Sequence, residues 1–511
     1  MMKQLDRIAC GVLAGLALTA LTLGAAQAAT QPRIGGTLNV GFVEDAKTLD
    51  PTFSVQWSER QVLYLVYNTL LRMQPDFSLT PELAESWEIQ EDGKRVVFKL
   101  REGVKFHDGT DFNAEAVKFN LDRRMDEAVG SPQRKQLAGV ISKVEVVDDH
   151  TVAVITETPF APLLSYLAER PGFMISPAAA EKYGEDFGSN PVGTGPFVFK
   201  EWTRGSRIVV EKNPDYWEEG LPYLDGVVFS DMGGSVVGMQ RLMTGELDYV
   251  DSLTPQDLQL LEGADGIELA QIIVGRWYSY QWQWDKPPFD NAKLRKAIAH
   301  AIDRDRLNEV TMRGQARLSN GPTPTGLWWH ADGLVGYDYD PEMARKLIAE
   351  AGAKGMEIGL ATPENQVLRQ LNQLVQEQLN EVGLKVELEP VAQSEWYSRV
   401  VERAINFTPM RWTQRPDPDG LLSILFHSGG FANSTGYSNP EVDRLLEKAR
   451  MTFDQPQRKE LYDQAHGLIL EDLPYVPIYF AAEFAAMRDR VMGFQWTPDQ
   501  VPRFYNVWLA Q

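Results

Sequence analysis

The most informative stretch of the chain runs from Glu85 to Gly109, ESWEIQEDGKRVVFKLREGVKFHDG. Trp87 and Ile89 alternate with polar residues, which is typical of a strand with one buried face. The next three residues, EDG, predict a turn because Gly93 adopts a positive φ without strain. Residues 96–100, VVFKL, resume a strand, and a second turn follows at 102–103. The stretch therefore predicts a β-hairpin.

Outward from this hairpin, strand-like and helix-like patterns alternate along the whole chain, without a fixed-period repeat or a long linker. This alternation predicts an α/β protein. A chain of 511 residues is too long for one core, so we expect two or three lobes. The expected strands cover residues 36–42, 143–147 and 151–155, and the expected helices cover 58–71, 113–124, 293–306, 339–351 and 440–451.

The charge balance narrows the class of partner. The chain has 50 Lys and Arg against 71 Asp and Glu, a net charge of −21. A nucleic-acid-binding protein needs a basic face, so this class is disfavoured, and the acidity favours solubility.

The N-terminus predicts a signal peptide over residues 1–28. Lys3 and Arg7 precede an apolar run, and Ala26-Gln27-Ala28 fits a cleavage site after Ala28. No other run is long and apolar enough to span a membrane, so we expect a periplasmic protein. Cys10 is the only cysteine and stands at the start of the apolar run, where a lipidated cysteine does not occur. The mature chain therefore lacks disulfides and thiolate metal ligands.

Signatures of catalysis and of metal binding are missing from the sequence. GxSxG, Walker A and strand-linked GxGxxG motifs are absent, and the six histidines form no HxH or HExxH pair. We predict that the protein is not an enzyme and uses no cofactor. A carboxylate pair of a secreted hydrolase, which sequence spacing does not reveal, remains a remote alternative.

Several motifs together resemble one large family. Residues 85–117 carry the hairpin and the continuation TDFNAEAV, residues 190–197 read NPVGTGPF, residues 213–217 read NPDYW, and PPFD at 287–290 precedes AIAHAIDR at 297–304. In this order they are similar to the extracytoplasmic solute-binding proteins of family 5, which serve peptide, opine and nickel ABC transporters. The resemblance covers nearly all of the mature chain.

The resemblance implies a periplasmic binding protein of the type II-like, cluster C class. It has three lobes and a hinge, with the ligand cleft between lobes I and III. The implied boundaries are 29–60, 191–274 and 476–511 for lobe I, 61–190 for lobe II and 275–475 for lobe III. The implied function is capture of a small solute, peptide-like or an amino-acid conjugate, and its delivery to an ABC permease and its ATPase subunits. We expect a monomer that binds no nucleic acid. The alternatives within the fold are a nickel-chelate, haem or oligosaccharide binder.

The aromatic run at 277–284, WYSYQWQW, has two interpretations. On a strand, Tyr278 and Tyr280 share one face with Trp282 and Trp284. This face is either part of a core or a lining of the ligand cleft. We include Tyr278 and Tyr280 among the candidate ligand contacts.

A second candidate is the loop MRWTQRPDPDG at 410–420. A Pro/Asp turn before a helix explains its end but leaves Trp412 and Arg415 unexplained. In dipeptide-binding relatives this loop offers an aspartate to the ligand's ammonium. The present chain has Gln414 or Arg415 there, and a cationic Arg415 attracts a carboxylate or phosphate instead.

The remaining candidates follow from the same resemblance. Relatives place an arginine for the ligand carboxylate near Thr362 and Glu364, where the alternative is a strand end that caps the next helix. Gln56 and Trp57 precede a helix at the implied cleft, although Trp57 also fits packing beneath lobe I. Arg134 stands near a position that nickel-binding relatives use for a chelator, and a solvated arginine is its alternative. His427 stands near a nickel-contacting histidine of those relatives, but we assign no metal site.

Overall fold

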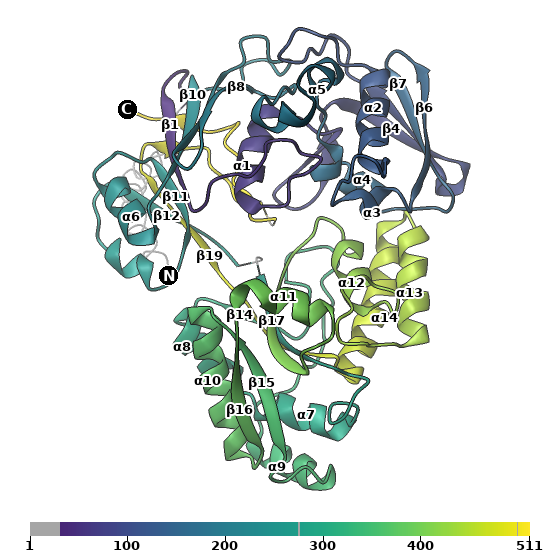
Figure 1. Ribbon diagram of the computed structural model, residues 1–511, viewed down its shortest axis with the longest axis vertical. Coiled ribbons are helices and arrows are strands. Elements are labelled where there is room, and N and C mark those ends of the chain that lie inside the picture. Colours follow the sequence, from purple (N-terminus) through teal and green to yellow (C-terminus); the bar gives the residue numbers. More distant parts are fainter. Residues whose placement is uncertain (1–30, 274–275, 498) are drawn as a thin grey trace, which may run out of the picture.

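The computed structural model describes residues 31–273, 276–497 and 499–511. The predicted signal peptide, its cleavage site and Cys10 lie outside the described residues. The described part divides in space into an upper and a lower body (Figure 1). Within this part, no helix combines the length and apolar character needed to cross a membrane.

The upper body is built around a mixed seven-stranded sheet. The order is β12-β19-β11-β1-β10-β9-β8, and β1 runs parallel to both β10 and β11. Strands from the start, the middle and the end of the chain thus meet in one sheet. Its strands are β1 Thr37–Phe42, β8 Phe197–Thr203, β9 Arg207–Lys212, β10 Gly226–Asp231, β11 Tyr249–Leu253, β12 Ile267–Ile272 and β19 Glu483–Arg488.

Three helices and a short strand pair complete this part of the upper body. The helices are α1 Trp57–Val66, α5 Pro177–Tyr183 and α6 Ser235–Met243, and the pair is β20 Val491–Met492 with β21 Trp508–Leu509. The expected helix 58–71 ends early, at Val66, because the chain turns extended at Tyr67. The Glu82 carboxylate then accepts hydrogen bonds from the Asn68 and Thr69 side chains and holds the extended course.

The most informative stretch forms the hairpin that the sequence predicts. β4 Ala84–Gln90 pairs antiparallel with β5 Arg95–Leu100, with Trp87 opposite Phe98, and Gly93 has φ +91°. β7 Thr151–Thr156 and β6 Ile141–Asp148 extend the sheet in the order β4-β5-β7-β6. The neighbouring elements are β2 Leu71–Met73, β3 Leu79–Pro81, α2 Ala114–Met125, α3 Arg134–Leu137 and α4 Leu163–Tyr166.

The lower body surrounds a four-stranded sheet in the order β14-β18-β13-β17. Its strands are β13 Arg276–Trp282, β14 Arg317–Leu318, β17 Phe407–Thr413 and β18 Tyr475–Phe480, and a parallel pair is formed by β15 Glu357–Pro363 and β16 Lys385–Val391. Its helices are α7 Ala292–Ala301, α8 Arg304–Met312, α9 Pro341–Glu350, α10 Gln366–Glu381, α11 Gln393–Val401, α12 Asp419–Phe426, α13 Pro440–Met451 and α14 Gln455–Asp472.

The predicted helix 293–306 is two helices. α7 ends at Ala301, and α8 begins after Asp303, whose side chain accepts a hydrogen bond from the Arg306 backbone N–H at 2.9 Å. An aspartate at an N-cap stabilises a new helix start, which explains the break. The predicted helix 440–451 has the expected bounds, and the predicted helix 113–124 begins and ends one residue later.

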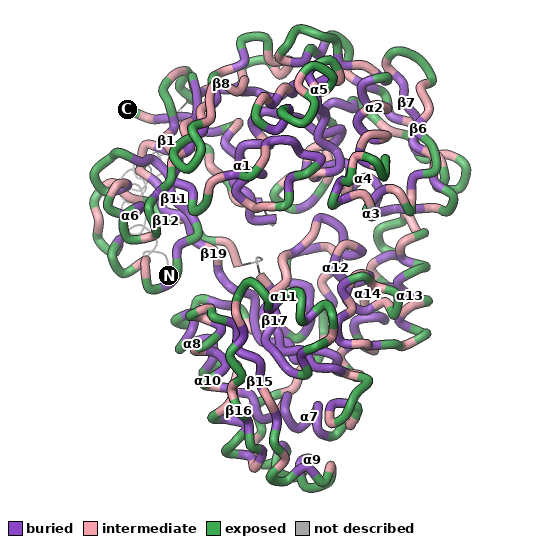
Figure 2. The backbone as a smooth tube through the Cα atoms, viewed as in Figure 1, coloured by how far each residue is buried: buried purple, intermediate pink, exposed green. Residues whose placement is uncertain are grey.

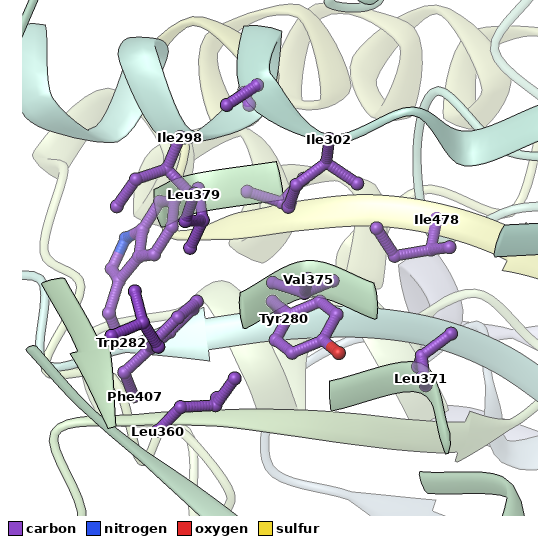
Figure 3. Close-up of a cluster of buried hydrophobic side chains, with 14 of the residues drawn as sticks. Tyr280, Trp282, Ile298, Ile302, Leu360, Leu371, Val375, Leu379, Phe407 and Ile478 are labelled. Carbon is purple, nitrogen blue, oxygen red and sulfur yellow. The ribbon is translucent and has the colours of Figure 1, made fainter. Parts of the chain in front are cut away.

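The core of the lower body lies between its sheet and helices α7 and α10. Figure 3 shows Tyr280 and Trp282 of β13 among aliphatic side chains such as Ile298 and Leu379. The central strands are buried, whereas helices such as α9 and α13 expose one side (Figure 2). Burial of this apolar surface is the main source of stability for such a body.

The chain passes between the bodies twice, from β12 to β13 and from β18 to β19. Residues 475–480 form β18, which pairs with β13 of the lower body. The strand that begins near the expected boundary at 476 therefore belongs to the lower sheet, and the chain rejoins the upper sheet at β19. The two close crossings allow one body to move against the other.

Candidate functional site

The upper side of the candidate site begins at the N-terminus of α1. The Glu59 carboxylate accepts hydrogen bonds from the backbone N–H groups of Val55 and Gln56, both at 2.9 Å, and so fixes the first turn. Gln56 and Trp57 are half-buried. The Trp57 indole Nε1 donates to the Gln500 carbonyl at 3.2 Å, which ties this turn to the C-terminal segment.

The C-terminal segment near α1 holds a buried charge network that the sequence analysis missed. Arg503 donates to the two Asp499 carboxylate oxygens, each at 2.9 Å, and Arg60 lies 3.9 Å from the same carboxylate. Burial raises the pKa of Asp499, but the two guanidinium groups outweigh burial and lower it to about 2. Gln500 is buried with φ +62°, an uncommon conformation for a side-chain-bearing residue. Such strain often accompanies functional positions.

On the lower side, β13 buries both of its faces. Tyr280 is fully buried (Figure 3). Its Oη donates to Asn372 Oδ1 at 2.7 Å. Tyr278 is also buried, with its ring 5.1 Å from the Tyr479 ring. This burial favours the core interpretation of the aromatic face, so we leave Tyr278 and Tyr280 out of the proposed ligand contacts.

The opposite face of β13 packs against helices α12, α13 and α14 and contacts the segment after β14. Trp277 pairs with Trp412 in the strand register, and its Nε1 donates to Ser319 Oγ at 3.1 Å. Two polar atoms here are buried without a hydrogen-bond partner among the described residues, Ser279 Oγ and Trp412 Nε1. Buried donors and acceptors are normally paired, so these atoms suit a bound polar molecule.

The loop after β17 presents the most informative candidates. Gln414 is buried, and its Nε2 donates to the Pro322 carbonyl at 3.0 Å, whereas its Oε1 has no partner within the described chain. Arg415 is half-buried and lays its carbon stem against Gly420. Among residues 31–273, 276–497 and 499–511, no ion pair or hydrogen bond of the Arg415 guanidinium is found.

The other predicted contacts have local structural roles. Thr362 is buried, donates to the Leu360 carbonyl at 3.0 Å and accepts from Asn372 at 2.9 Å. Glu364 is exposed, and Asn365 caps helix α10 through the Leu368 backbone N–H. The strand-end interpretation of this segment therefore explains its contacts.

Arg134 and His427 also form ordinary surface contacts. Arg134 donates to the Met125 carbonyl at 2.9 Å and lies 3.5 Å from the Glu127 carboxylate. His427, which follows the end of α12, places its Nε2 3.1 Å from Oε1 of Glu447 in α13. Among the described residues, no group of three or more His, Cys, Asp or Glu side chains is placed to hold a metal ion.

The two bodies touch beside this loop. Tyr166 of α4 donates its Oη to Asp419 Oδ2 at 3.3 Å, and the Ala161 backbone N–H donates to the Arg450 carbonyl at 2.9 Å. Asp419 stands at the start of α12, directly after the loop that carries Gln414 and Arg415. The candidate site therefore joins the α1 side of the upper body to the β17–α12 side of the lower body.

Known proteins match this chain over most of its length. Glutathione-binding protein GsiB of Escherichia coli (strain K12) is 34% identical over 466 residues, which cover 88% of this chain and 90% of that protein. The periplasmic binding protein DppA from Helicobacter pylori, in complex with the peptide STSA, matches with a TM-score of 0.81 and 27% identity over 94% of this chain and 99% of that one. The binding protein AgaA from A. tumefacien R10, in complex with agropinic acid, matches with a TM-score of 0.78 and 28% identity over 93% and 99%.

The family model described as bacterial extracellular solute-binding proteins, family 5, matches residues 78–433. This match spans the hairpin, the crossing to the lower body and the loop with Arg415. The chain therefore belongs to family 5 of the bacterial extracellular solute-binding proteins.

Proposed function

We propose that this protein is the periplasmic substrate-binding component of an ABC importer and that its solute is peptide-like and carries acidic groups. The observation that carries the proposal is the match to glutathione-binding GsiB over nearly the whole chain. Glutathione is a short peptide with two carboxylates. A ligand of this kind needs cationic partners. Within the part of the chain that the structure describes, the Arg415 guanidinium forms no ion pair or hydrogen bond, and Oε1 of the adjacent Gln414 has no partner.

The solute binds between the α1 side of the upper body and the β17–α12 side of the lower body. Gln56, Trp57, Trp412, Gln414 and Arg415 are the proposed contacts. In this account the sheet of residues 37–42 and 483–488 belongs to lobe I, the hairpin sheet to lobe II and the lower body to lobe III. Closure needs only that the ligand binds the closed arrangement more tightly than the open one.

A micromolar ligand supplies about 8 kcal/mol of binding free energy, which is enough to shift a hinge that favours the open state. The closed form is then presented to the permease and its ATPase subunits. Residues 1–28 direct export and are removed after Ala28 in this proposal, and the mature protein works as a monomer.

A thermal-shift screen of the mature protein tests the proposal. Its probes are reduced glutathione, dipeptides, an opine, an oligosaccharide, haem and nickel–histidine, with product analysis for the peptides. We expect a short acidic peptide such as glutathione to raise the melting temperature and to remain intact, because binding to the folded state stabilises it. A shift with haem, the oligosaccharide or nickel–histidine alone would contradict the proposal, and peptide hydrolysis would indicate the hydrolase alternative.

A further inference from the structure

Arg170 is an arginine of the upper body that forms no ion pair with a carboxylate among the described residues. It opens the short helical turn Arg170–Gly172 and is half-buried. Its Nη1 lies 3.3 Å from the Val55 carbonyl and 3.5 Å from the Ser54 carbonyl, next to the N-terminus of α1. The adjacent Glu169 carboxylate is engaged by Arg60 at 3.3 Å. Within the described part of the chain, Arg170 therefore contacts only neutral acceptors.

On the lower body, Arg415 likewise forms no ion pair with a carboxylate among the described residues. The acids nearest to it in sequence are both committed elsewhere. Asp417 forms a two-point ion pair with Arg458 at 2.7 and 2.9 Å. Asp419 accepts from Ser423 at 2.6 Å and pairs with Arg450 at 2.9 Å. Both acids of this loop are therefore paired with other arginines, and no carboxylate of the described residues forms an ion pair with Arg415.

The segments that carry the two arginines meet at the boundary between the bodies, because Tyr166, four residues before Arg170, donates to Asp419, four residues after Arg415, at 3.3 Å. Burial lowers the pKa of Arg170, and the like charges of Arg60 and Arg415 lower it further, to about 10, against the opposing effect of Glu169. The Arg170 guanidinium therefore stays charged at neutral pH. Beside Arg170, Val55 is exposed, with an exposed fraction of 57%.

We propose that Arg170 and Arg415 form a two-sided site for one carboxylate of the ligand, which bridges the bodies in the closed state. This inference rests on the proposed function and deepens it by adding Arg170 as a specificity residue. Without the carboxylate, the two like charges repel each other and favour separation of the bodies. With it, each guanidinium gains a charge-assisted hydrogen bond. The ligand class is therefore anionic, and blocking its carboxylate removes the bridge.

A ligand-free experiment tests the repulsion directly. Expression of residues 29–511 removes the single cysteine, so Glu181→Cys on the upper body and Lys346→Cys on the lower body can carry a spin-label pair. At low salt, we expect a shorter distance between the two labels in Arg170→Gln and in Arg415→Gln than in the wild type. In the wild type, addition of about 0.5 M salt should also shorten this distance, because salt at this concentration screens charges that lie more than a few ångströms apart. The double variant should add nothing further, because the first change already removes the repulsion.

Matched controls are Arg207→Gln on the upper body and Arg306→Gln on the lower body, which remove exposed arginines paired with Glu201 and Glu377. The proposal is overturned if the label distance changes as much in the control variants as in Arg170→Gln and Arg415→Gln. It is also overturned if the label distance in Arg170→Gln and Arg415→Gln equals that of the wild type. The spin-label experiment uses no ligand, so its outcome does not depend on the proposed function.

The second arm compares reduced glutathione with its monoethyl ester, in which the glycyl carboxylate is blocked. We expect the wild-type protein to prefer glutathione by about tenfold, the equivalent of one charge-assisted hydrogen bond, and both variants to lose this preference. Equal affinity for both probes in wild type and variants would overturn the arginine site and leave the proposed function standing. No binding of any peptide probe would instead count against the proposed function, and the label distances would then judge the arginine pair.

Discussion

Asp417 and Arg458 form a two-point ion pair beneath the loop that carries Arg415. The Asp417 carboxylate oxygens accept from the two Arg458 terminal nitrogens at 2.7 and 2.9 Å, and both side chains are buried. The Arg458 Nε also donates to the Ala449 carbonyl at 3.1 Å, so helices α13 and α14 are tied to the loop. The pair fixes the loop backbone from which the proposed ligand contacts project.

Asp417→Asn should destabilise the protein strongly, because the change leaves the buried Arg458 guanidinium without its counter-charge. Loss of one partner of a buried pair costs roughly 3–5 kcal/mol. The free energy of unfolding from urea titration measures the effect. Glu441→Gln, which breaks an exposed pair with Arg444, is the control and should change the free energy of unfolding far less, because solvent screens exposed ion pairs. Equal losses in both variants would show that the buried pair has no special role.

The stability of the upper body should fall as the pH rises through neutrality because of Asp251. This residue is fully buried and accepts from Gln61 at 3.2 Å and from Ser252 at 3.1 Å. Burial, followed by the nearby Glu483, raises the pKa of Asp251 from 3.8 to about 7. The folded state therefore keeps its proton up to about pH 7, whereas the unfolded chain releases it near pH 4.

Because the folded state keeps this proton at a higher pH than the unfolded state does, the free energy of unfolding falls as the pH rises. The stabilising contribution of protonated Asp251 is complete below about pH 4 and is lost as the pH rises through about 7. Asp251→Asn should gain stability relative to wild type between pH 5 and pH 8, at most on the order of 4 kcal/mol across the full window. Asp186→Asn, at an exposed position, is the control. A wild-type-to-variant difference that does not vary with pH would contradict the assignment.

Tyr166→Phe should weaken ligand binding without unfolding the protein. The change removes the 3.3 Å hydrogen bond from the Tyr166 Oη of the upper body to the Asp419 carboxylate of the lower body. One hydrogen bond of about 1 kcal/mol corresponds to roughly fivefold weaker binding of glutathione by calorimetry. Tyr183→Phe, whose ring contacts the Lys182 ammonium within the upper body, is the control. Unchanged affinity in Tyr166→Phe would mean that this contact does not support the closed state.

The fold was largely predictable because local patterns determine its elements. The hairpin at 84–100 follows from alternation and from a glycine with positive φ, and α13 follows from its helical spacing and Asn439 cap. The hydrophobic periodicity alone did not predict the end of α1 or the break within residues 293–306. α1 stops at Val66 because Glu82, from another strand region, holds the next residues extended, and the 293–306 helix breaks where Asp303 starts a new one.

The candidate site was only partly predictable. Trp412 and Arg415 stand out because the loop pattern leaves them unexplained, and Gln414 was named from the resemblance to dipeptide-binding proteins. No sequence pattern singled out Arg170, because the adjacent Glu169 is engaged by Arg60, more than a hundred residues away in the sequence, and no other described carboxylate pairs with Arg170. Tyr280 shows the converse. Its strand pattern fits a core face and a binding face equally well, and only the contact with Asn372 distinguishes them.

Calorimetric titration of reduced glutathione into the wild-type protein and into Arg415→Ala tests the central claim most directly. We expect micromolar binding to the wild type and at least about tenfold weaker binding to Arg415→Ala. Arg306→Ala, which changes an exposed arginine of the same body, should keep the wild-type affinity. Equal affinity in wild type and Arg415→Ala would remove Arg415 from the site and contradict the claim that an acidic, peptide-like solute is read there.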